Sequence, residues 1–190
     1  MRKGRGRDIT SVSIGLIVSL LLVVSPAEAQ SETLEKAAIE ELKDQASELI
    51  DKKKYEDLIL VYKKLADANV PYGMNGLAVS YARGDGVEKS PENAVLWLQK
   101  AVDLKYPEAI TSLGLRYEEG NGLVKDISKA NALYEEAAAA GDSRAMHFLG
   151  LNYKQGIGFE KNLIEAFRWF QKELCISSFS LREHYWGRGY

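Results

Sequence analysis

The heptapeptide YARGDGV, residues 81–87, decides the fold because the chain returns to it twice, as YEEGNGL at 117–123 and YKQGIGF at 153–159. The tyrosines and both glycines of the three copies keep one constant interval of 36 residues. A gapless period of this length is typical of repeat architectures. The columns in register are Leu77, Leu113 and Leu149; Tyr81, Tyr117 and Tyr153; Gly84, Gly120 and Gly156; Gly86, Gly122 and Gly158; Ala94, Ala130 and Ala166; and Trp97, Leu133 and Trp169.

Each copy is expected to form two helices. A leucine and a tyrosine four residues apart lie on one helical face. A glycine just past a helix accepts the left-handed backbone that closes the last turn. The second helices then follow Ser90, Asp126 and Asn162, which are all good N-cap residues. The predicted pairs are 71–83 with 91–104, 107–119 with 127–140, and 143–155 with 163–175.

Stacking of these hairpins follows from energetics. Ordering 36 residues costs on the order of 50 kcal/mol, and one hairpin buries only one face to offset that cost. The Ala94 column lets the two helices of a hairpin approach, and the Trp97 column is expected to fill the space between hairpins. Removing Trp97 or Trp169 should then cost about 3–5 kcal/mol each. The predicted fold class is all-α, a right-handed solenoid of stacked helical hairpins.

The pattern Leu-Ala/Gly-x-x-Tyr-x-x-Gly-x-Gly-Val, then Ala-x-x-Trp and Lys-Ala-Ala, resembles the Sel-1-like repeat (SLR), a relative of the tetratricopeptide repeat. The resemblance covers about 77–172. Three residues depart from the pattern: Leu133 replaces a tryptophan, Lys105 a glycine and Glu173 an alanine. The resemblance implies an adaptor whose stacked first helices form a concave face for a peptide, a loop or another domain, in exported bacterial members often in the cell envelope.

The register continues more faintly on both sides. Residues 34–50 and 55–68 are expected to form a divergent hairpin that caps the N-terminal end. Ser178 lies 36 residues after Asp142 and is predicted to cap a lone first helix, whose open end is either a self-cap or an adhesive surface. A chain that stops within a repeat also fits a shortened family member. The predicted divisions are a signal peptide (1–29), an N-terminal cap (30–70), three repeats (71–106, 107–142 and 143–177) and a partial repeat or C-terminal cap (178–190).

The first 29 residues predict export. Four basic residues within the first seven precede the apolar run VSIGLIVSLLLVV at 12–24, and small residues follow at Ala27 and Ala29. This is the pattern of a secretory signal peptide cut after Ala29. The alternative is an uncleaved membrane anchor, but the run is shorter than the roughly 20 residues that span a bilayer. We expect a periplasmic or secreted protein without a stable membrane anchor after cleavage.

The composition excludes several classes of protein. Apolar residues make up 46% and charged residues 27%, which is typical of a globular protein. The net charge is −2 and the sequence contains no long basic run, so nucleic acid is a poor candidate partner. Cys175 is the only cysteine, and no disulfide can form within the chain. Its neighbours Leu174 and Ile176 predict a buried, small apolar side chain.

The sequence predicts no catalytic, cofactor or metal site. The glycine pairs follow helices rather than strands and lack the Gly-Lys-Ser/Thr ending of a phosphate-binding loop. The Gly-x-Ser-x-Gly, His-Glu-x-x-His and Cys-x-x-Cys patterns are also absent. We therefore expect a non-enzymatic protein. The alternative is a cell-wall enzyme of the SLR family, a β-lactam or peptidoglycan hydrolase, which a turnover assay would distinguish.

At two positions of the first helices the residue type changes from repeat to repeat. These two columns are the predicted contacts for a partner. The alternative for both is simple exposure to solvent. The expected partner is another protein or a peptide segment, from the envelope or from a host, and changing Arg116 should weaken its binding while leaving helicity intact. The candidate residues are Asn75, Thr111 and His147 in one column and Ser80, Arg116 and Asn152 in the other.

Overall fold

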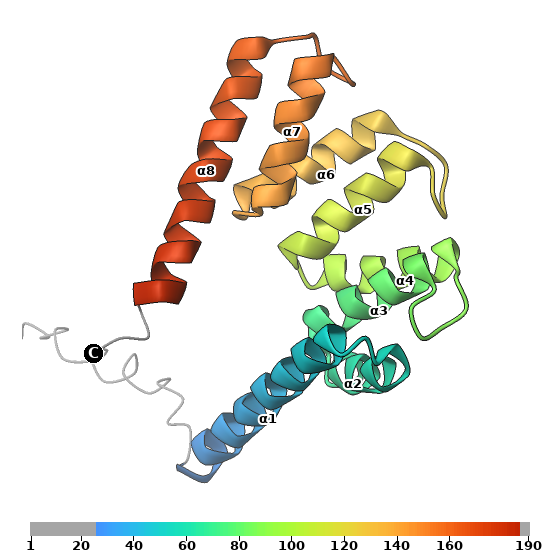
Figure 1. Ribbon diagram of the computed structural model, residues 1–190, viewed down its shortest axis with the longest axis vertical. Helices are drawn as coiled ribbons and strands as arrows, with labels where there is room; N and C mark the ends of the chain where they lie inside the picture. Colours follow the sequence, from blue (N-terminus) through green and yellow to red (C-terminus); the bar gives the residue numbers. More distant parts are fainter. Residues whose placement is uncertain (1–25, 187–190) are drawn as a thin grey trace, which may run out of the picture. The chain divides into compact units, whose positions relative to one another are not determined.

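A computed structural model describes residues 26–186, with side chains from 35 to 178. Every regular element in this range is an α-helix (Figure 1). The chain divides into two compact units, Met1–Glu40 and Glu41–Tyr190, and α1 (Pro26–Asp51) contributes to both. The second unit also contains α2 (Tyr55–Asp67), α3 (Pro71–Arg83), α4 (Pro91–Asp103), α5 (Pro107–Glu119), α6 (Ile127–Ala139), α7 (Ser143–Gln155) and α8 (Leu163–Trp186).

The predicted signal peptide lies largely outside the described residues, which begin at Pro26. Within 26–186, no helix combines the length and the apolar character that crossing a membrane requires. Export therefore remains a prediction from the sequence.

The helices of the second unit pack in chain order. Three hairpins form from α3 with α4, α5 with α6 and α7 with α8, and α2 packs on α3. Successive hairpins stack through contacts of α4 with α5 and of α6 with α7, while the first helices α3, α5 and α7 contact one another in sequence (Figure 1). The predicted all-α solenoid of stacked hairpins is confirmed.

The helix boundaries follow local chemistry. The first glycine of each pair caps its helix with φ between 71° and 83°, and its amide donates to the carbonyl four residues earlier. The predicted N-cap side chains accept backbone amides at the start of the second helices. Ser90 Oγ accepts from Asn93 N at 3.2 Å, Asp126 Oδ1 from Lys129 N at 3.0 Å, and Asn162 Oδ1 from Ile164 N at 3.0 Å.

The second glycine of each pair allows neighbouring repeats to approach closely. A Cβ atom on Gly86 would lie 2.5 Å from the carbonyl oxygen of Tyr55, at the start of α2. A Cβ atom on Gly122 would lie 2.4 Å from the carbonyl oxygen of Pro91, at the start of α4. Gly158 approaches side chains of α6 instead, since a Cβ atom on it would lie 2.6 Å from Ile127 Cγ2. Each glycine loop is therefore seated on the second helix of the preceding repeat.

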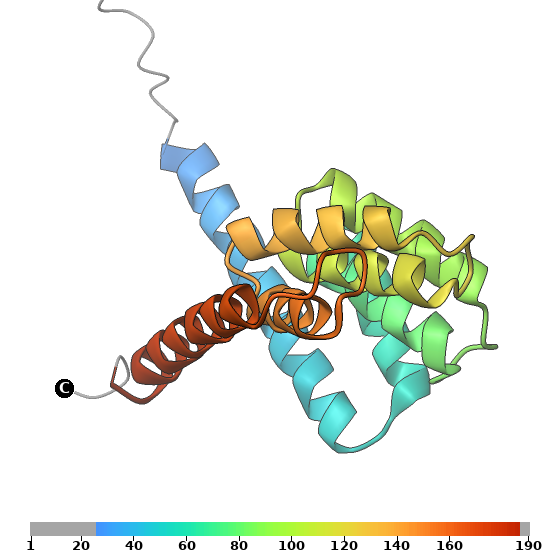
Figure 2. The ribbon, with the colours of Figure 1, turned by 90° about the horizontal axis from the view of Figure 1, so that it is seen from above.

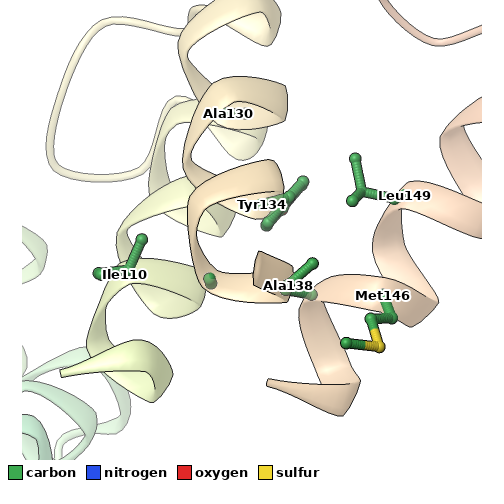
Figure 3. Close-up of a cluster of buried hydrophobic side chains, with 8 residues drawn as sticks. Ile110, Ala130, Tyr134, Ala138, Met146 and Leu149 are labelled. Carbon is green, nitrogen blue, oxygen red and sulfur yellow. The ribbon is translucent and has the colours of Figure 1, made fainter. Parts of the chain in front are cut away.

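The apolar core lies between successive helices. Figure 3 shows Tyr134 and Ala138 of α6 clustered with Ile110 of α5 and with Met146 and Leu149 of α7. All five side chains are buried, and the cluster joins the second repeat to the third. The largest fully buried side chains of the described residues are Tyr134, Leu65, Leu77, Leu98, Ile110, Leu149 and Thr111.

Within each hairpin, a small residue of the first helix faces a large residue of the second helix. A Cβ atom on Gly114 would lie 2.7 Å from the ring of Tyr134, and one on Gly150 would lie 2.5 Å from the ring of Phe170. In the first repeat, the same two register positions hold the buried pair Ala78 and Leu98. A glycine therefore accompanies the aromatic ring, whereas an alanine accompanies the smaller leucine.

The tryptophans occupy a different environment from the one predicted. Trp97 and Trp169 are only half-buried. A lysine ammonium lies 4.0 Å from the ring centroid of each, Lys100 over Trp97 and Lys172 over Trp169. In the first repeat, the residue that follows the tryptophan in the chain, Leu98, is the one that is fully buried. Truncating either tryptophan should therefore cost less than the 3–5 kcal/mol expected of a buried ring.

The C-terminal end also differs from the prediction. The helix expected to end at 175 continues without a break to Trp186 as α8. Ser178 does not cap a new helix; it lies inside α8, where its hydroxyl donates to the carbonyl oxygen of Cys175 at 2.9 Å. The predicted new helix at Ser178 is therefore wrong, since residues 178–186 belong to α8. Whether 178–190 serves as a C-terminal cap stays a prediction.

Cys175 is exposed, so the prediction of a buried thiol is wrong. The repeat register explains the error. The equivalent residues of the earlier repeats, Asp103 and Ala139, also face solvent. Apolar neighbours in the sequence do not place a residue on the buried face of a helix, because adjacent residues point in directions about 100° apart.

Candidate functional site

The structure separates the six predicted partner contacts into buried and accessible residues. Ser80, Thr111 and Asn152 are only 3%, 1% and 3% exposed. These three side chains cannot line an open surface, so this part of the prediction is wrong. Their positions face neighbouring helices, and the Thr111 hydroxyl is satisfied locally by donating to the Pro107 carbonyl oxygen at 3.2 Å.

Asn152 forms a buried polar link between repeats. Its Nδ2 donates to Asn131 Oδ1 at 2.7 Å. Asn131 Nδ2 in turn donates to the carbonyl oxygen of Ile157 at 3.0 Å. The two amides therefore connect α7, α6 and the glycine loop of the third repeat, and their role is structural.

Replacing Asn152 by alanine should lower the free energy of unfolding by about 1–3 kcal/mol, because the buried Asn131 oxygen loses its donor. Asn93 is exposed on α4, and its replacement by alanine is the control, with an expected change within about 0.5 kcal/mol. Urea denaturation followed by circular dichroism measures both. Equal effects of the two variants would contradict the structural role of Asn152.

The other three candidates do not form one cluster. His147 is exposed on α7, and its Nδ1 lies 3.0 Å from Glu173 Oε2 on α8. Asn75 is half-buried on α3, and its Oδ1 is buried without a hydrogen-bond partner among the described residues. Arg116 alone borders a hollow of the surface.

This hollow, which we call the arginine hollow, lies where α3, α4, α5 and the start of α7 meet. Each of the three first helices contributes one arginine. Its apolar lining includes Leu98 and Leu115. The remaining lining residues are Ala78, Val79, Ala82 and Arg83 of α3, Ser112 and Arg116 of α5, and Arg144 of α7.

The electrostatics of the arginine hollow favour an anionic group. Arg116 Nη1 lies 3.6 Å from Glu119 Oε2, its side chain is 17% exposed, and its Nε is buried without a hydrogen-bond partner among the described residues. Arg144 Nη2 donates to the carbonyl oxygen of Glu108 at 3.1 Å and lies 3.8 Å from a carboxylate oxygen of Asp142. Three arginines thus line the hollow, and two of them lie near a carboxylate, Arg116 near Glu119 and Arg144 near Asp142. A planar guanidinium fork with spare donors suits a carboxylate ligand.

Sequence periodicity could not identify Arg83 and Arg144. The residue 36 positions after Arg83 is Glu119, and the residue 36 positions before Arg144 is Glu108. The arginines therefore occupy different register positions, and only the stacking of the first helices brings them together. Within the described part of the chain, no group of three or more histidine, cysteine and acidic side chains could hold a metal ion.

Comparison with known proteins defines the class. The Sel1 repeat model matches residues 71–106, 107–142 and 143–172. These matches cover more than half of the 190 residues, so the chain belongs to the Sel1 repeat family. Proteins of this family typically mediate protein–protein interactions, and its scaffold proteins are generally not enzymes.

Three solved structures are similar to the chain. A Sel1 repeat protein from Oxalobacter formigenes has a TM-score of 0.64 and 32% identity, over 70% of this chain and 54% of that one. A protective antigen present in uropathogenic Escherichia coli strains, with an SLR fold, has a TM-score of 0.62 and 26% identity, over 74% of this chain and 31% of that one. Helicobacter pylori cysteine rich protein B has a TM-score of 0.51 and 28% identity, over 66% of this chain and 90% of that one. The chain thus spans about half and about a third of the first two proteins. No curated protein matches the chain.

Proposed function

We propose that the protein is an exported, non-enzymatic adaptor that binds an acidic segment of another protein in its arginine hollow. The observation that carries the proposal is the convergence of Arg83, Arg116 and Arg144 from three successive first helices. Family membership supports a protein partner. The basic and apolar pattern of residues 1–29 supports export.

The geometry suits one or two carboxylate side chains rather than a flat protein surface. Arg116 is held in place by its burial and by Glu119, so little side-chain entropy is lost on binding. The apolar lining from Val79 and Leu115 can contact the methylene groups of an aspartate or glutamate side chain. Exposed Arg83 can close over the ligand from the α3 side.

Binding of acidic peptides tests the proposal. An array of peptides rich in aspartate and glutamate is compared with the same peptides carrying asparagine and glutamine. The protein should bind the acidic set, and Arg83→Ala and Arg116→Lys should each weaken binding about tenfold, because a charge-assisted hydrogen bond contributes about 1.5–3 kcal/mol. Arg116→Lys keeps the charge and much of the buried side chain, so it separates recognition from folding.

The control is Lys63→Ala, which removes an exposed cation of α2 outside the arginine hollow. Circular dichroism should show unchanged helicity for all three variants. Equal binding of acidic and amide peptides would contradict recognition by the arginines. Export is tested separately, by sequencing the N-terminus of the protein from a cell envelope fraction, where cleavage after Ala29 is expected.

A further inference from the structure

The last helix exposes an apolar stripe. Leu163, Phe167 and Leu174 of α8 are 61%, 61% and 67% exposed. Their spacings of four and seven residues place them on one face of the helix. We call this set the α8 stripe. Exposed apolar residues that are aligned in this way indicate a contact surface rather than isolated surface positions.

The repeat register shows what the α8 stripe corresponds to. The residues 36 positions earlier, on α6, are Ile127, Asn131 and Ala138. Asn131 and Ala138 are buried, and a Cβ atom on Gly158 would lie 2.6 Å from Ile127 Cγ2. In the second repeat this face is therefore the interface that receives α7 and its glycine loop. The α8 stripe is the same interface, and no other helix between residues 26 and 186 packs on it.

The face is open because α8 does not turn back. The turns after α2, α4 and α6 use left-handed residues in register, namely Asn69, Lys105 and Gly141, with φ of 57°, 58° and 93°. The next residue in this series is Ser177, which is helical. As a result α8 has 24 residues whereas α7 has 13, and α8 extends beyond α7 (Figure 1 and Figure 2).

The residues of the α8 stripe do not suit a further Sel1 repeat. Asn131 donates to the loop carbonyl of Ile157 and accepts from Asn152. Phe167 stands at its register position, and a phenyl ring can make neither bond. Val95, at this register position on α4, makes neither bond either, yet the Gly122 loop is seated there, so size rather than hydrogen bonding is the difference. The loop of the third repeat packs directly on Asn131, since a Cβ atom on Gly158 would lie 2.4 Å from its Nδ2, and Phe167 is larger than both Asn131 and Val95. A plain apolar helix without a glycine loop fits this face better.

We propose that two copies of the chain pair through α8, with the two helices antiparallel and each α8 stripe covered by the other. In the second copy, α3, α5 and α7 cannot cover the stripe with the faces that already pack on α2, α4 and α6. Of the described second helices, α8 alone has its next-repeat face open. The interface is then isologous, which is the common form for a dimer, and it continues the stacking interface already used between α6 and α7.

The chemistry of α8 supports self-pairing. Its 24 residues form a rod about 36 Å long, which is ample for a helix–helix contact. The spacing of four and seven residues is the seam spacing of paired helices. Arg168 lies beside the seam, and its charge is paired within the helix by Glu165. Antiparallel pairing also places opposite ends of the two helix dipoles together.

The molar mass in solution tests the proposal. Sedimentation velocity of the purified protein should show a species of twice the mass of one chain, which is 21.2 kDa for all 190 residues and less after cleavage behind Ala29. Phe167→Glu and Leu174→Glu should each raise the dimer dissociation constant at least about tenfold. Leu96→Glu on α4 is the matched control, since Leu96 is 62% exposed and lies outside the α8 stripe; it should leave the dimer unchanged.

Circular dichroism of the variants keeps the test independent of folding, since each substituted side chain is exposed. A wild-type protein that remains monomeric up to about 100 µM would overturn the proposal. So would a dimer that Leu96→Glu weakens as much as Phe167→Glu does. Peptide binding by the arginine hollow is measured separately, and either result can stand without the other.

Discussion

Replacing Tyr134 by alanine is expected to lower the free energy of unfolding by about 3–5 kcal/mol. The side chain is fully buried between the second and third repeats. Its ring stacks on that of Phe148 with centroids 5.0 Å apart. Alanine would leave a cavity that Gly114, packed against the ring, cannot fill. Because neighbouring repeats stabilise each other, the loss should weaken both sides of the interface.

Tyr134→Phe is the matched control. It keeps the ring and removes only the hydroxyl, which donates to Glu118 Oε2 at 2.7 Å. Burial, and secondly the hydrogen bond to Glu118, raise the pKa of Tyr134 well above its ordinary value, so the hydroxyl is a donor at neutral pH. The expected loss is about 1 kcal/mol. Urea denaturation measures the free energy of unfolding of both variants. Similar losses would mean that the ring does not hold the repeats together.

Gly122→Ala is expected to destabilise the protein by about 2–5 kcal/mol. Two effects combine at this position. Its φ of 84° is unfavourable for a residue with a Cβ atom by about 1–2 kcal/mol. The added methyl group would also lie 2.4 Å from the backbone carbonyl oxygen of Pro91, and such overpacking costs about 1–3 kcal/mol.

Gly141→Ala separates the two effects. Gly141 has a similar φ of 93°, but no atom lies within 4 Å of the position of an added Cβ atom. This variant should therefore lose only the conformational part, about 1–2 kcal/mol. Thermal and urea denaturation of the pair give the difference, which isolates the contact between repeats. If Gly141→Ala proved as damaging as Gly122→Ala, the seating of the loop on α4 would contribute nothing.

The sequence predicts the fold because the decisive residues act locally. Ser90, Asp126 and Asn162 are different residues, yet each accepts a backbone amide at the start of a second helix. The glycines after the first helices adopt the left-handed backbone that the pattern requires. The first helices consequently have the predicted boundaries, and the described second helices of the first two repeats end one residue early.

The candidate surface is harder to predict, because a position whose residue type varies between repeats is not necessarily exposed. The residues at this position differ because their partners differ too: Asn152 of the third repeat is bonded to Asn131 of the second repeat, whereas the residue equivalent to Asn131 in the first repeat is Val95. Arg83 and Arg144 were missed for the opposite reason. They share no register position, and stacking alone brings them to Arg116.

The predicted helix boundary near Ser178 is wrong because the repeat here lacks the left-handed residue that ends the earlier second helices. The register suggested a new helix at Ser178, but Ser177 does not adopt the left-handed backbone of Asn69, Lys105 and Gly141. A serine between helix-forming neighbours lets the helix continue. Periodicity identifies equivalent positions, whereas the residue at each position decides whether the chain bends there.

Because each glycine loop packs on the preceding repeat, the repeats can fold in order from the N-terminal end. The loops of Gly86 and Gly122 rest on backbone that precedes them in the chain. A hairpin that emerges later in the chain thus meets a finished support, because folding generally proceeds N-terminal part first. Assembly can proceed in the order of synthesis, and no repeat has to wait for a later one to receive its loop.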